Sequence, residues 1–337
     1  MMLPTIRPSE IEQDSSMDCN PQSSPQTRKP YSPPVLTSSS DWPRITMVTP
    51  VYNGVRFIED TIRSIINQGY PNLEYIIVDG GSTDGTLDII RKYQKHIAWW
   101  TSTRDNGVYD ALNKGFAQST GDIMGWLNAS DLLHISGLFV VGSVFATFPA
   151  VEWLTGRPTR FNPDGMTVDI RQLPVWSRYR FLAGANRYIQ QESTFWRRSL
   201  WEKAGGALND AYRDVGDFDL WVRFFRHARL YSVDALIGGY RFHPDAISAS
   251  DMLRYNHKCD KIIDSELKSM PRAGAVKAFR RVSSAVSNIP KVRGIWQRVA
   301  IKGLYQLAGP DLPPVVADQE NKWVIRERMR RMRSLPW

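Results

Sequence analysis

The stretch of sequence that decides the fold reads ITMVTPVYNG at residues 45–54 and LEYIIVDGGSTDGT at residues 73–86. Each piece opens with a run of apolar, mainly β-branched residues and closes with turn-forming residues, a pattern typical of a short buried strand. Between the pieces, residues 58–66 carry isoleucines at helical spacing, and Gly-Tyr-Pro at residues 69–71 ends that helix. The stretch therefore predicts strands over 45–49 and 73–78 with a helix between them.

The same alternation continues after the second strand. Residues 82–85 provide turn and N-cap chemistry for a helix over 87–93, and strands over 98–101 and 123–127 flank a helix over 111–116. This order predicts an α/β fold with a doubly wound, mostly parallel sheet flanked by helices. Such sheets bind ligands at the carboxyl ends of their strands. We therefore expect a site among the polar residues that follow the strands: Thr49, Asp79, Arg104, Asp105 and residues 128–131.

Composition limits the class of protein. The chain has 337 residues, and its apolar content of 42% supports a core without covalent cross-links. Its two cysteines, Cys19 and Cys259, cannot form a disulfide framework or a cysteine metal site, and they favour a reducing cytosol. No run approaches the roughly 20 apolar residues that span a bilayer, and no signal-peptide pattern opens the chain. We expect a cytoplasmic protein, soluble or peripheral at the inner face of the plasma membrane.

The sequence divides into three parts. Residues 1–40 are rich in Pro and Ser and predict a disordered tail, residues 44–250 hold the α/β domain, and residues 251–337 predict a basic helical extension. The pattern weakens over residues 151–184, which suits an irregular insertion or a short antiparallel ribbon.

The positive charge is concentrated at the C-terminus. The chain has a net charge of +9, and residues 268–337 alone hold 15 Lys and Arg against 4 Asp and Glu. Residues 277–307 alternate basic and apolar side chains, as do amphipathic helices that lie on an anionic membrane surface; packing as ordinary solvated helices is the alternative. No motif supports nucleic-acid binding.

Five ordered segments resemble those of glycosyltransferase family 2, whose members have the GT-A nucleotide-diphospho-sugar transferase fold. The segments are Thr49–Gly54, Val78–Thr86, Asp105–Gly115, Gly125–Asp131 and Gly216–Trp221, and the resemblance covers about residues 44–250. It implies an inverting hexosyltransferase that moves a sugar from a nucleotide-diphospho-sugar donor to an acceptor hydroxyl. The acceptor would be a glycan or lipid-linked glycan in bacterial cell-surface polysaccharide biosynthesis.

Seven residues are expected on the donor nucleotide side. A base needs a planar slot lined by hydrogen-bonding groups. Relatives often carry a second aspartate after Asp79 that contacts the base, but Gly80 stands here, so this contact shifts to Asp79 or the backbone. The alternatives are an ordinary turn residue at Asp79 and a solvated i,i+4 pair of Asp110 with Lys114. The expected residues are Thr49, Pro50, Tyr52, Asn53, Asp79, Asp110 and Lys114.

A divalent cation, Mn²⁺ or Mg²⁺, would stabilise the charge on the departing nucleoside diphosphate. Members commonly place two acidic residues in the turn that here reads Asn128-Ala129-Ser130-Asp131, so only Asp131 remains as a charged ligand. An N-cap role is its alternative. By resemblance, His243 lies near the metal or diphosphate, although a lone histidine is more often structural.

Inversion requires a base on the face opposite the leaving group, and an Asp carboxylate is ionised at neutral pH unless strongly desolvated. By resemblance this base is Asp217, with Asp219 as its rival; either aspartate could instead be an ordinary first-turn residue of the following helix. The resemblance also implies an acceptor side formed by Gln191, Glu192 and Trp221.

Two rival functions stay open. A catalytically inactive binding or scaffold protein of the same fold is made plausible by Ser130. A sugar nucleotidyltransferase usually has a Gly-rich loop with Arg or Lys after its first strand, and residues 49–54 contain no such basic residue.

Overall fold

The computed structural model describes residues 42–184, 187–243, 252–271, 273–286, 314–319 and 322–327. Some predictions concern residues outside these ranges. They are the predictions for residues 1–40, for residues 287–307 and for most of the basic run over 326–333.

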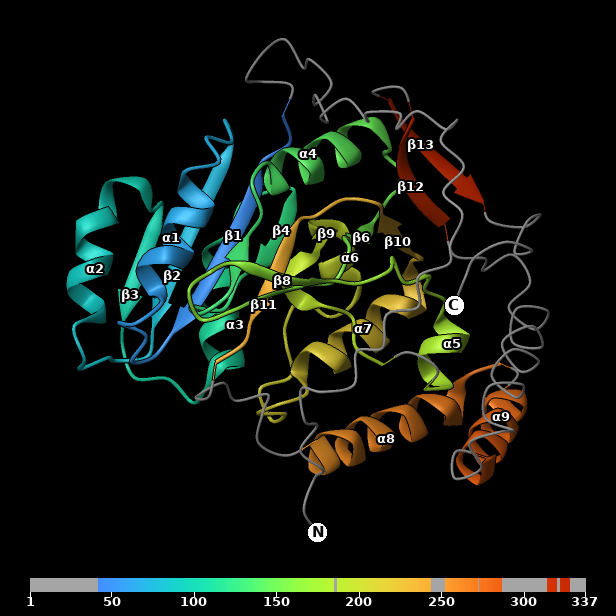
Figure 1. Ribbon diagram of the computed structural model, residues 1–337. Coiled ribbons are helices and arrows are strands. Elements are labelled where there is room, and N and C mark those ends of the chain that lie inside the picture. Colours follow the sequence, from blue (N-terminus) through green and yellow to red (C-terminus); the bar gives the residue numbers. More distant parts are fainter. Residues whose placement is uncertain are drawn as a thin grey trace, which may run out of the picture. The chain divides into compact units, whose positions relative to one another are not determined.

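The main sheet has nine strands within the described residues, in the order β13-β12-β10-β6-β9-β4-β1-β2-β3 (Figure 1). Strands β1, β2, β3 and β4 are mutually parallel where they pair, while β9 runs antiparallel to β4 and β6, and β13 to β12. The predicted mostly parallel sheet is therefore confirmed. Its strands are β1 (Ile45–Val51), β2 (Leu73–Asp79), β3 (Trp99–Ser102), β4 (Ile123–Trp126), β6 (Trp153–Thr155), β9 (Thr194–Arg197), β10 (Leu230–Val233), β12 (Pro314–Gln319) and β13 (Lys322–Glu327).

Helices flank this sheet and explain the apolar spacing of the sequence. Helix α1 (Ile58–Ile66) buries Ile58, Ile62 and Ile65, which lie on one face. Helix α3 (Val108–Gln118) packs closely on β1 and β2. This packing needs a glycine at position 115, because a Cβ there would lie 2.5 Å from Val48 Cγ1. The other helices are α2 (Thr86–Tyr93), α4 (Gly137–Thr147), α5 (Arg178–Leu182), α6 (Arg198–Lys203), α7 (Gly216–His227), α8 (Met252–Ser269) and α9 (Ala273–Val286), with 3₁₀ turns η2 (Gln94–His96) and η3 (Gln191–Ser193).

A second sheet has four strands, and two of them, β7 and β8, come from residues 151–184, where the sequence pattern was weak. Its order is β5-β11-β7-β8, with β5 (Leu132–Leu133), β7 (Thr159–Phe161), β8 (Thr167–Ile170) and β11 (Gly238–Arg241). Strands β7 and β8 form an antiparallel ribbon, as one of the two expectations for residues 151–184 proposed. The segment also contributes β6 to the main sheet, which the weak pattern did not predict.

Tryptophans form the core beneath the middle of the main sheet. The ring of Trp221 on α7 stacks on Trp126 of β4 at 5.8 Å and on Trp153 of β6 at 5.6 Å. Trp196 of β9 meets Trp126 edge to face at 5.4 Å. Large apolar rings buried in this way contribute heavily to stability, and they fix α7 against the sheet.

Within its described residues, the C-terminal part contains both helices and strands. Helices α8 and α9 agree with the prediction of helices after residue 251, but residues 314–319 and 322–327 form strands that extend the sheet beyond β10. The segment 322–327 reads KWVIRE, and its β-branched and aromatic residues favour strand pairing over the expected helix. Trp323 secures this hairpin by donating its Nε1–H to Ser143 Oγ on α4 at 2.9 Å.

Glu266 holds α8 against the domain. Its carboxylate accepts from Arg178 of α5 at 2.7 Å and from Arg226 of α7 at 2.6 Å, and its side chain is only 3% exposed. Burial opposes ionisation, but the hydrogen bonds from Arg226 and Arg178 outweigh it and hold the pKa of Glu266 below its usual value.

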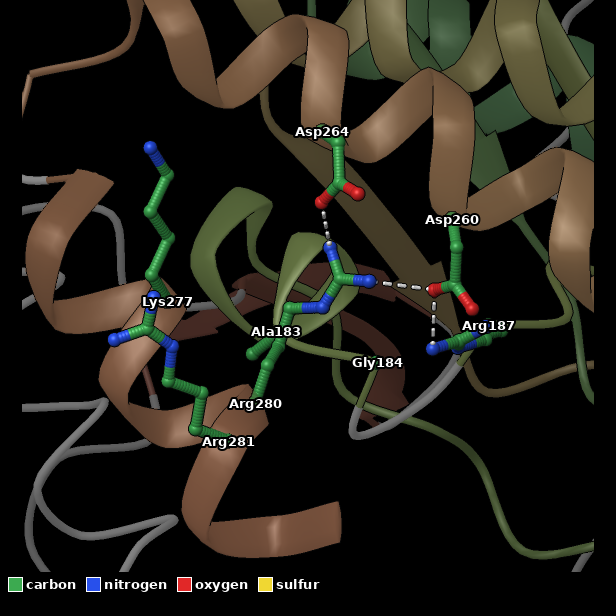
Figure 2. Close-up of a pocket in the computed structure, with 8 residues that line it drawn as sticks. All are labelled: Ala183, Gly184, Arg187, Asp260, Asp264, Lys277, Arg280 and Arg281. Carbon is green, nitrogen blue, oxygen red and sulfur yellow. Dashed lines mark hydrogen bonds and ion pairs between the residues drawn. The ribbon is translucent and has the colours of Figure 1, made fainter.

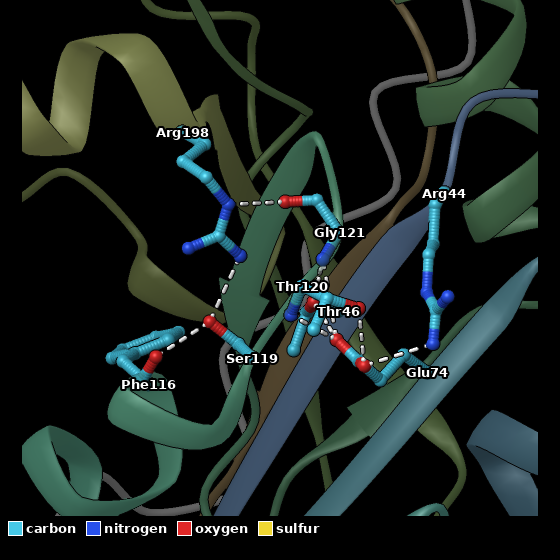
Figure 3. Close-up of polar contacts among 8 residues, drawn as sticks. All are labelled: Arg44, Thr46, Glu74, Phe116, Ser119, Thr120, Gly121 and Arg198. Carbon is cyan, nitrogen blue, oxygen red and sulfur yellow. Dashed lines mark hydrogen bonds and ion pairs between the residues drawn. The ribbon is translucent and has the colours of Figure 1, made fainter.

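A second buried carboxylate fixes the amino ends of the parallel strands (Figure 3). Glu74, at the start of β2, accepts from Thr46 Oγ1 at 2.6 Å, from the main chain and side chain of Thr120 at 2.7 Å each, and from Arg44 at 2.9 Å. This cluster joins β1, β2 and the turn before β4 at the end of the strands remote from their carboxyl edge.

Candidate active site

The carboxyl ends of β1, β2 and β4 gather most of the predicted polar residues at one edge of the sheet. The loops after β1 and β2 are tied together, because the Asn53 N–H donates to Ser82 Oγ at 2.7 Å and the Thr83 N–H donates to Asn53 Oδ1 at 2.9 Å. Asn53 adopts a left-handed conformation with a φ of 49°, which asparagine tolerates better than most residues. The two loops thus form a single rigid wall.

Asp79 is fully buried and faces its own loop. Its Oδ2 accepts from the N–H groups of Gly81 at 3.0 Å and Ser82 at 2.9 Å and from Ser102 Oγ at 2.6 Å, while Oδ1 accepts from Ser82 Oγ. This geometry supports the alternative role of a turn residue that shapes the loop, and the direct contact between Asp79 and a base stays a prediction.

The other donor-side residues differ in exposure. Thr49 and Pro50 are buried in β1, where Thr49 Oγ1 accepts from Tyr75 at 3.1 Å, whereas the Tyr52 side chain is 66% exposed. Asp110 and Lys114 form an i,i+4 ion pair at 3.1 Å. This geometry agrees with the alternative interpretation, in which Asp110 and Lys114 are an ion pair on the helix surface and do not bind the nucleotide.

Asp105, which follows β3, lies against Gly80 in the loop after β2. A Cβ placed on Gly80 would lie 2.6 Å from Asp105 Oδ2, so the Asp105 carboxylate rests against the glycine. The sequence showed Asp105 as a polar residue after a strand, but the contact between the two loops is tertiary and left no local pattern.

Asp131 and Glu192 form a buried acidic pair. Asp131 is 1% exposed, its Oδ1 accepts from the Arg241 N–H at 2.9 Å, and its Oδ2 accepts from Asn128 Nδ2 at 3.2 Å. Burial raises the pKa of both carboxyls, and the nearby charge of Asp131 raises that of Glu192 further. Two carboxyls this close and this buried favour sharing a proton over carrying two negative charges.

These residues do not fit the predicted cation site. Asp131 accepts main-chain and side-chain hydrogen bonds that join β11 to the end of β4, and its neighbour Ser130 is neutral. His243 packs its ring 4.7 Å from that of Phe57. Across the described residues, no group of three or more His, Cys, Asp or Glu side chains gathers in a way that could hold a metal ion. A requirement for Mn²⁺ or Mg²⁺ stays a prediction, and no step below depends on it.

The predicted acceptor residues are buried and engaged. Gln191 accepts from Asn128 Nδ2 at 3.2 Å and donates to the Trp126 carbonyl, so it fixes η3 to the end of β4. Trp221 is 1% exposed within the tryptophan core, and it supports the site by packing instead of presenting a surface to an acceptor. Glu192 belongs to the acidic pair.

Asp217 lies in the first turn of α7 and is partly exposed. It accepts from the Tyr109 hydroxyl at 3.2 Å, and burial raises its pKa. The rival Asp219 is instead paired with Arg223 at 2.9 Å. Gly216 lies under the Tyr109 ring, where a Cβ would come within 2.8 Å of ring carbons, so glycine is needed for this contact. Asp217 is therefore the better-placed base of the two.

Comparison with known proteins identifies the class. The fold is similar to that of S. aureus TarS residues 1–349, solved in complex with UDP-GlcNAc, with a TM-score of 0.58 at 15% identity over 79% of this chain and 81% of that one. Residues 46–138 match the model of the family described as Glycosyl transferase family 2. The predicted GT-A-like fold is thus confirmed, and residues 46–138 are similar to glycosyltransferase family 2.

Individual relatives match parts of the chain. Over 172 residues it is 30% identical to an uncharacterized glycosyltransferase of Mycobacterium tuberculosis (strain ATCC 25618 / H37Rv), covering 49% of this chain and 62% of that protein. Over 98 residues it is 36% identical to TuaG of Bacillus subtilis (strain 168), a putative teichuronic acid biosynthesis glycosyltransferase, covering 27% of this chain and 38% of TuaG. The chain therefore spans less than two thirds of the length of these relatives.

Proposed function

We propose that the protein is an inverting glycosyltransferase that moves a sugar from a nucleotide-diphospho-sugar to an acceptor hydroxyl. The observation that carries this proposal is Asp217, a partly exposed carboxylate in the first turn of α7 that has no basic side chain paired with it among the described residues. The match of residues 46–138 to the family model and the rigid loop wall at the carboxyl edge of the sheet support the same function.

The reaction needs one base and one leaving group. Asp217 takes the proton of the acceptor hydroxyl, the hydroxyl oxygen bonds to the anomeric carbon, and the bond from that carbon to the diphosphate oxygen breaks on the opposite face. The nucleoside diphosphate departs with the bonding electrons, and the anomeric configuration inverts. The raised pKa of Asp217 makes its carboxylate a stronger base than an ordinary aspartate.

Tyr109 positions this base. Its hydroxyl donates to Asp217 Oδ1 at 3.2 Å, and this bond orients the carboxylate. Because Gly216 packs under the Tyr109 ring, the start of α7 and the start of α3 are fixed relative to each other. The base is therefore held in place before substrate binds, which lowers the entropic cost of reaction.

The acceptor is proposed to be a glycan or lipid-linked glycan of a cell-surface polysaccharide. The described function of TuaG, in teichuronic acid biosynthesis, supports this class of acceptor. No helix in the described parts of the chain is long and apolar enough to cross a membrane.

An anionic membrane surface is proposed as a further partner, which would place the enzyme at the inner face of the plasma membrane. A cleft of about 880 Å³ between α5, α8 and α9 is lined by four basic and two acidic side chains (Figure 2). Arg187 and Arg280 pair with Asp260. Figure 2 shows Lys277 and Arg281 together on α9, away from the aspartates. We propose that these two cations contact the phosphate groups of the membrane.

Release of nucleoside diphosphate from a panel of nucleotide sugars tests the proposed function, with the full-length protein assayed with and without Mn²⁺. We expect release from at least one donor. The inactive-scaffold alternative predicts that donors bind, as seen by thermal shift, without any release. Absence of release with every donor that binds would overturn the proposal.

A further inference from the structure

The segment that leads into η3 exposes an aromatic side chain. Gln191, Glu192 and Ser193 of η3 are buried, whereas Tyr188, a few residues earlier, is 50% exposed. A tyrosine ring held in one position offers a large, rigid contact area at a low cost in conformational entropy. Tyr188 is therefore a residue of this segment that a ligand can reach.

Tyr188 is held in place although it is half exposed. Its ring stacks on that of Tyr255 of α8 with the ring centroids 5.8 Å apart, and its hydroxyl donates to Asn256 Oδ1 at 3.0 Å. The preceding residue, Arg187, pairs with Asp260 of α8 at 2.9 Å (Figure 2). We call Tyr188 and Tyr255 the tyrosine stack. It covers one face of the Tyr188 ring and leaves the other face for a ligand.

The tyrosine stack lies beside the proposed base. Helix α8 packs on α7 (Figure 1), and Lys258 of α8 pairs with Asp214 in the loop that leads to Asp217. Burial raises the pKa of Tyr255, and the nearby charge of Asp217 raises it further. Because the interaction of two charges weakens with distance, this effect indicates that Tyr255 is close to Asp217.

We propose that the tyrosine stack binds the acceptor sugar, and that this sugar is a pyranose with one unbroken face of axial C–H bonds. This inference rests on the proposed function. The face of an aromatic ring is electron-rich, so it attracts the slightly positive hydrogens of such a sugar face. Equatorial hydroxyls lie around the edge of the sugar ring, so stacking leaves them free to reach Asp217.

Saturation-transfer NMR of the full-length protein with methyl β-D-glucopyranoside tests the proposal. In this sugar the hydrogens on carbons 1, 3 and 5 are axial on one face of the ring, and those on carbons 2 and 4 are axial on the other. We expect the wild-type protein to saturate one of the two sets at least about twofold more strongly than the other, because only one face contacts Tyr188. Sorbitol, a linear polyol without a ring face, should receive almost no saturation.

Substitutions of Tyr188 separate the ring from its hydroxyl. Tyr188→Ala should reduce saturation of the glucoside at least about fivefold, the range expected for losing an aromatic stacking partner. Tyr188→Phe keeps the ring and should behave as the wild type, although the bond to Asn256 is lost. Tyr93→Ala, which removes a partly exposed tyrosine of α2 bonded to Glu59, is the matched control and should leave the saturation unchanged. Donor binding by calorimetry should be the same in all three variants.

The outcomes separate this inference from the proposed function. Equal saturation of both sugar faces by the wild type, absence of saturation, or undiminished saturation by Tyr188→Ala would overturn the acceptor site, while nucleoside diphosphate release by the wild type still supports a transferase. An equal loss in Tyr188→Phe and Tyr188→Ala would assign the effect to the hydroxyl and overturn the role of the ring. Face-selective saturation by a protein that releases no nucleoside diphosphate from any donor would instead contradict the proposed function.

Discussion

Glu74 and Asp217 show how residue environment sets the behaviour of a carboxyl group. Burial raises the pKa of Asp217, and the hydrogen bonds from the Phe218 main chain and the Tyr109 hydroxyl do not cancel that effect. Burial also opposes ionisation of Glu74, but hydrogen bonds from Thr120 and Thr46 and the charge of Arg44 outweigh it and lower its pKa. The first group is suited to accept a proton, and the second to stay charged.

Replacement of Glu74 by Ala should destabilise the fold by about 1–3 kcal/mol near neutral pH, because buried donors of Thr46 and Thr120 lose their acceptor. The folded pKa of Glu74 is lowered, so its contribution is present above the unfolded pKa of about 4.3 and is lost as pH falls through the folded pKa. Urea unfolding at pH 7 and pH 3 measures this. The difference between wild type and Glu74→Ala should shrink at pH 3, whereas Glu202→Ala, an exposed control on α6, should show little effect at either pH.

Equal destabilisation by Glu74→Ala at both pH values would show that lost packing, and not the charged hydrogen-bond cluster, accounts for the effect.

Single residues were predictable from the sequence where a motif fixed their position along the chain. The segment Gly216–Trp221 singled out Asp217, the structure adds the Tyr109 contact, and the role of Asp217 as the base stays a prediction. The pairing of Asp131 with Glu192 was not predictable, because it joins loops 61 residues apart whose approach depends on Gln191 binding the end of β4.

At the scale of elements, α8 and α9 present the basic cleft on the domain surface. Lys277 and Arg281 are four residues apart on α9 and so lie on one face of the helix. Arg280 is neutralised by Asp260 and Asp264. The net positive charge of this face therefore comes from Lys277 and Arg281.

Reversing these two charges tests the proposed membrane surface. The protein carrying Lys277→Glu and Arg281→Glu should bind phosphatidylcholine vesicles that contain phosphatidylglycerol at least about 30-fold more weakly than wild type in a sedimentation assay, since each basic residue near an anionic surface contributes about 1 kcal/mol. Lys95→Glu, a surface change on η2 outside the cleft, is the control. Equal binding of wild type to vesicles with and without phosphatidylglycerol would contradict the proposal.

Elements were predictable where local periodicity and burial agree. The isoleucines of α1 predicted a helix because they recur at helical spacing, and Ile58, Ile62 and Ile65 are buried in the structure. The hairpin of β12 and β13 was missed because its strand pairing is set by β10, far away in the sequence, and because the basic composition after residue 268 outweighed the strand-favouring residues of 322–327.

At the scale of the whole molecule, the sheet assembles a site from distant segments. The loops after β1 and β2 form one wall, which we propose binds the nucleotide, and α7 brings Asp217 to Tyr109, 108 residues away in the chain. The order of strands and helices predicted this edge, but the assignment of roles among its carboxylates required their hydrogen bonds and exposure.

The central claim is that Asp217 acts as the base of an inverting transfer. Proton NMR of the sugar first released from an α-linked donor, recorded before the product mutarotates, measures it most directly. We expect the β anomer from wild-type protein, and Asp217→Asn should lower the rate at least about 100-fold while donor binding by calorimetry is unchanged. Release of the α anomer, or full turnover by Asp217→Asn, would contradict the account.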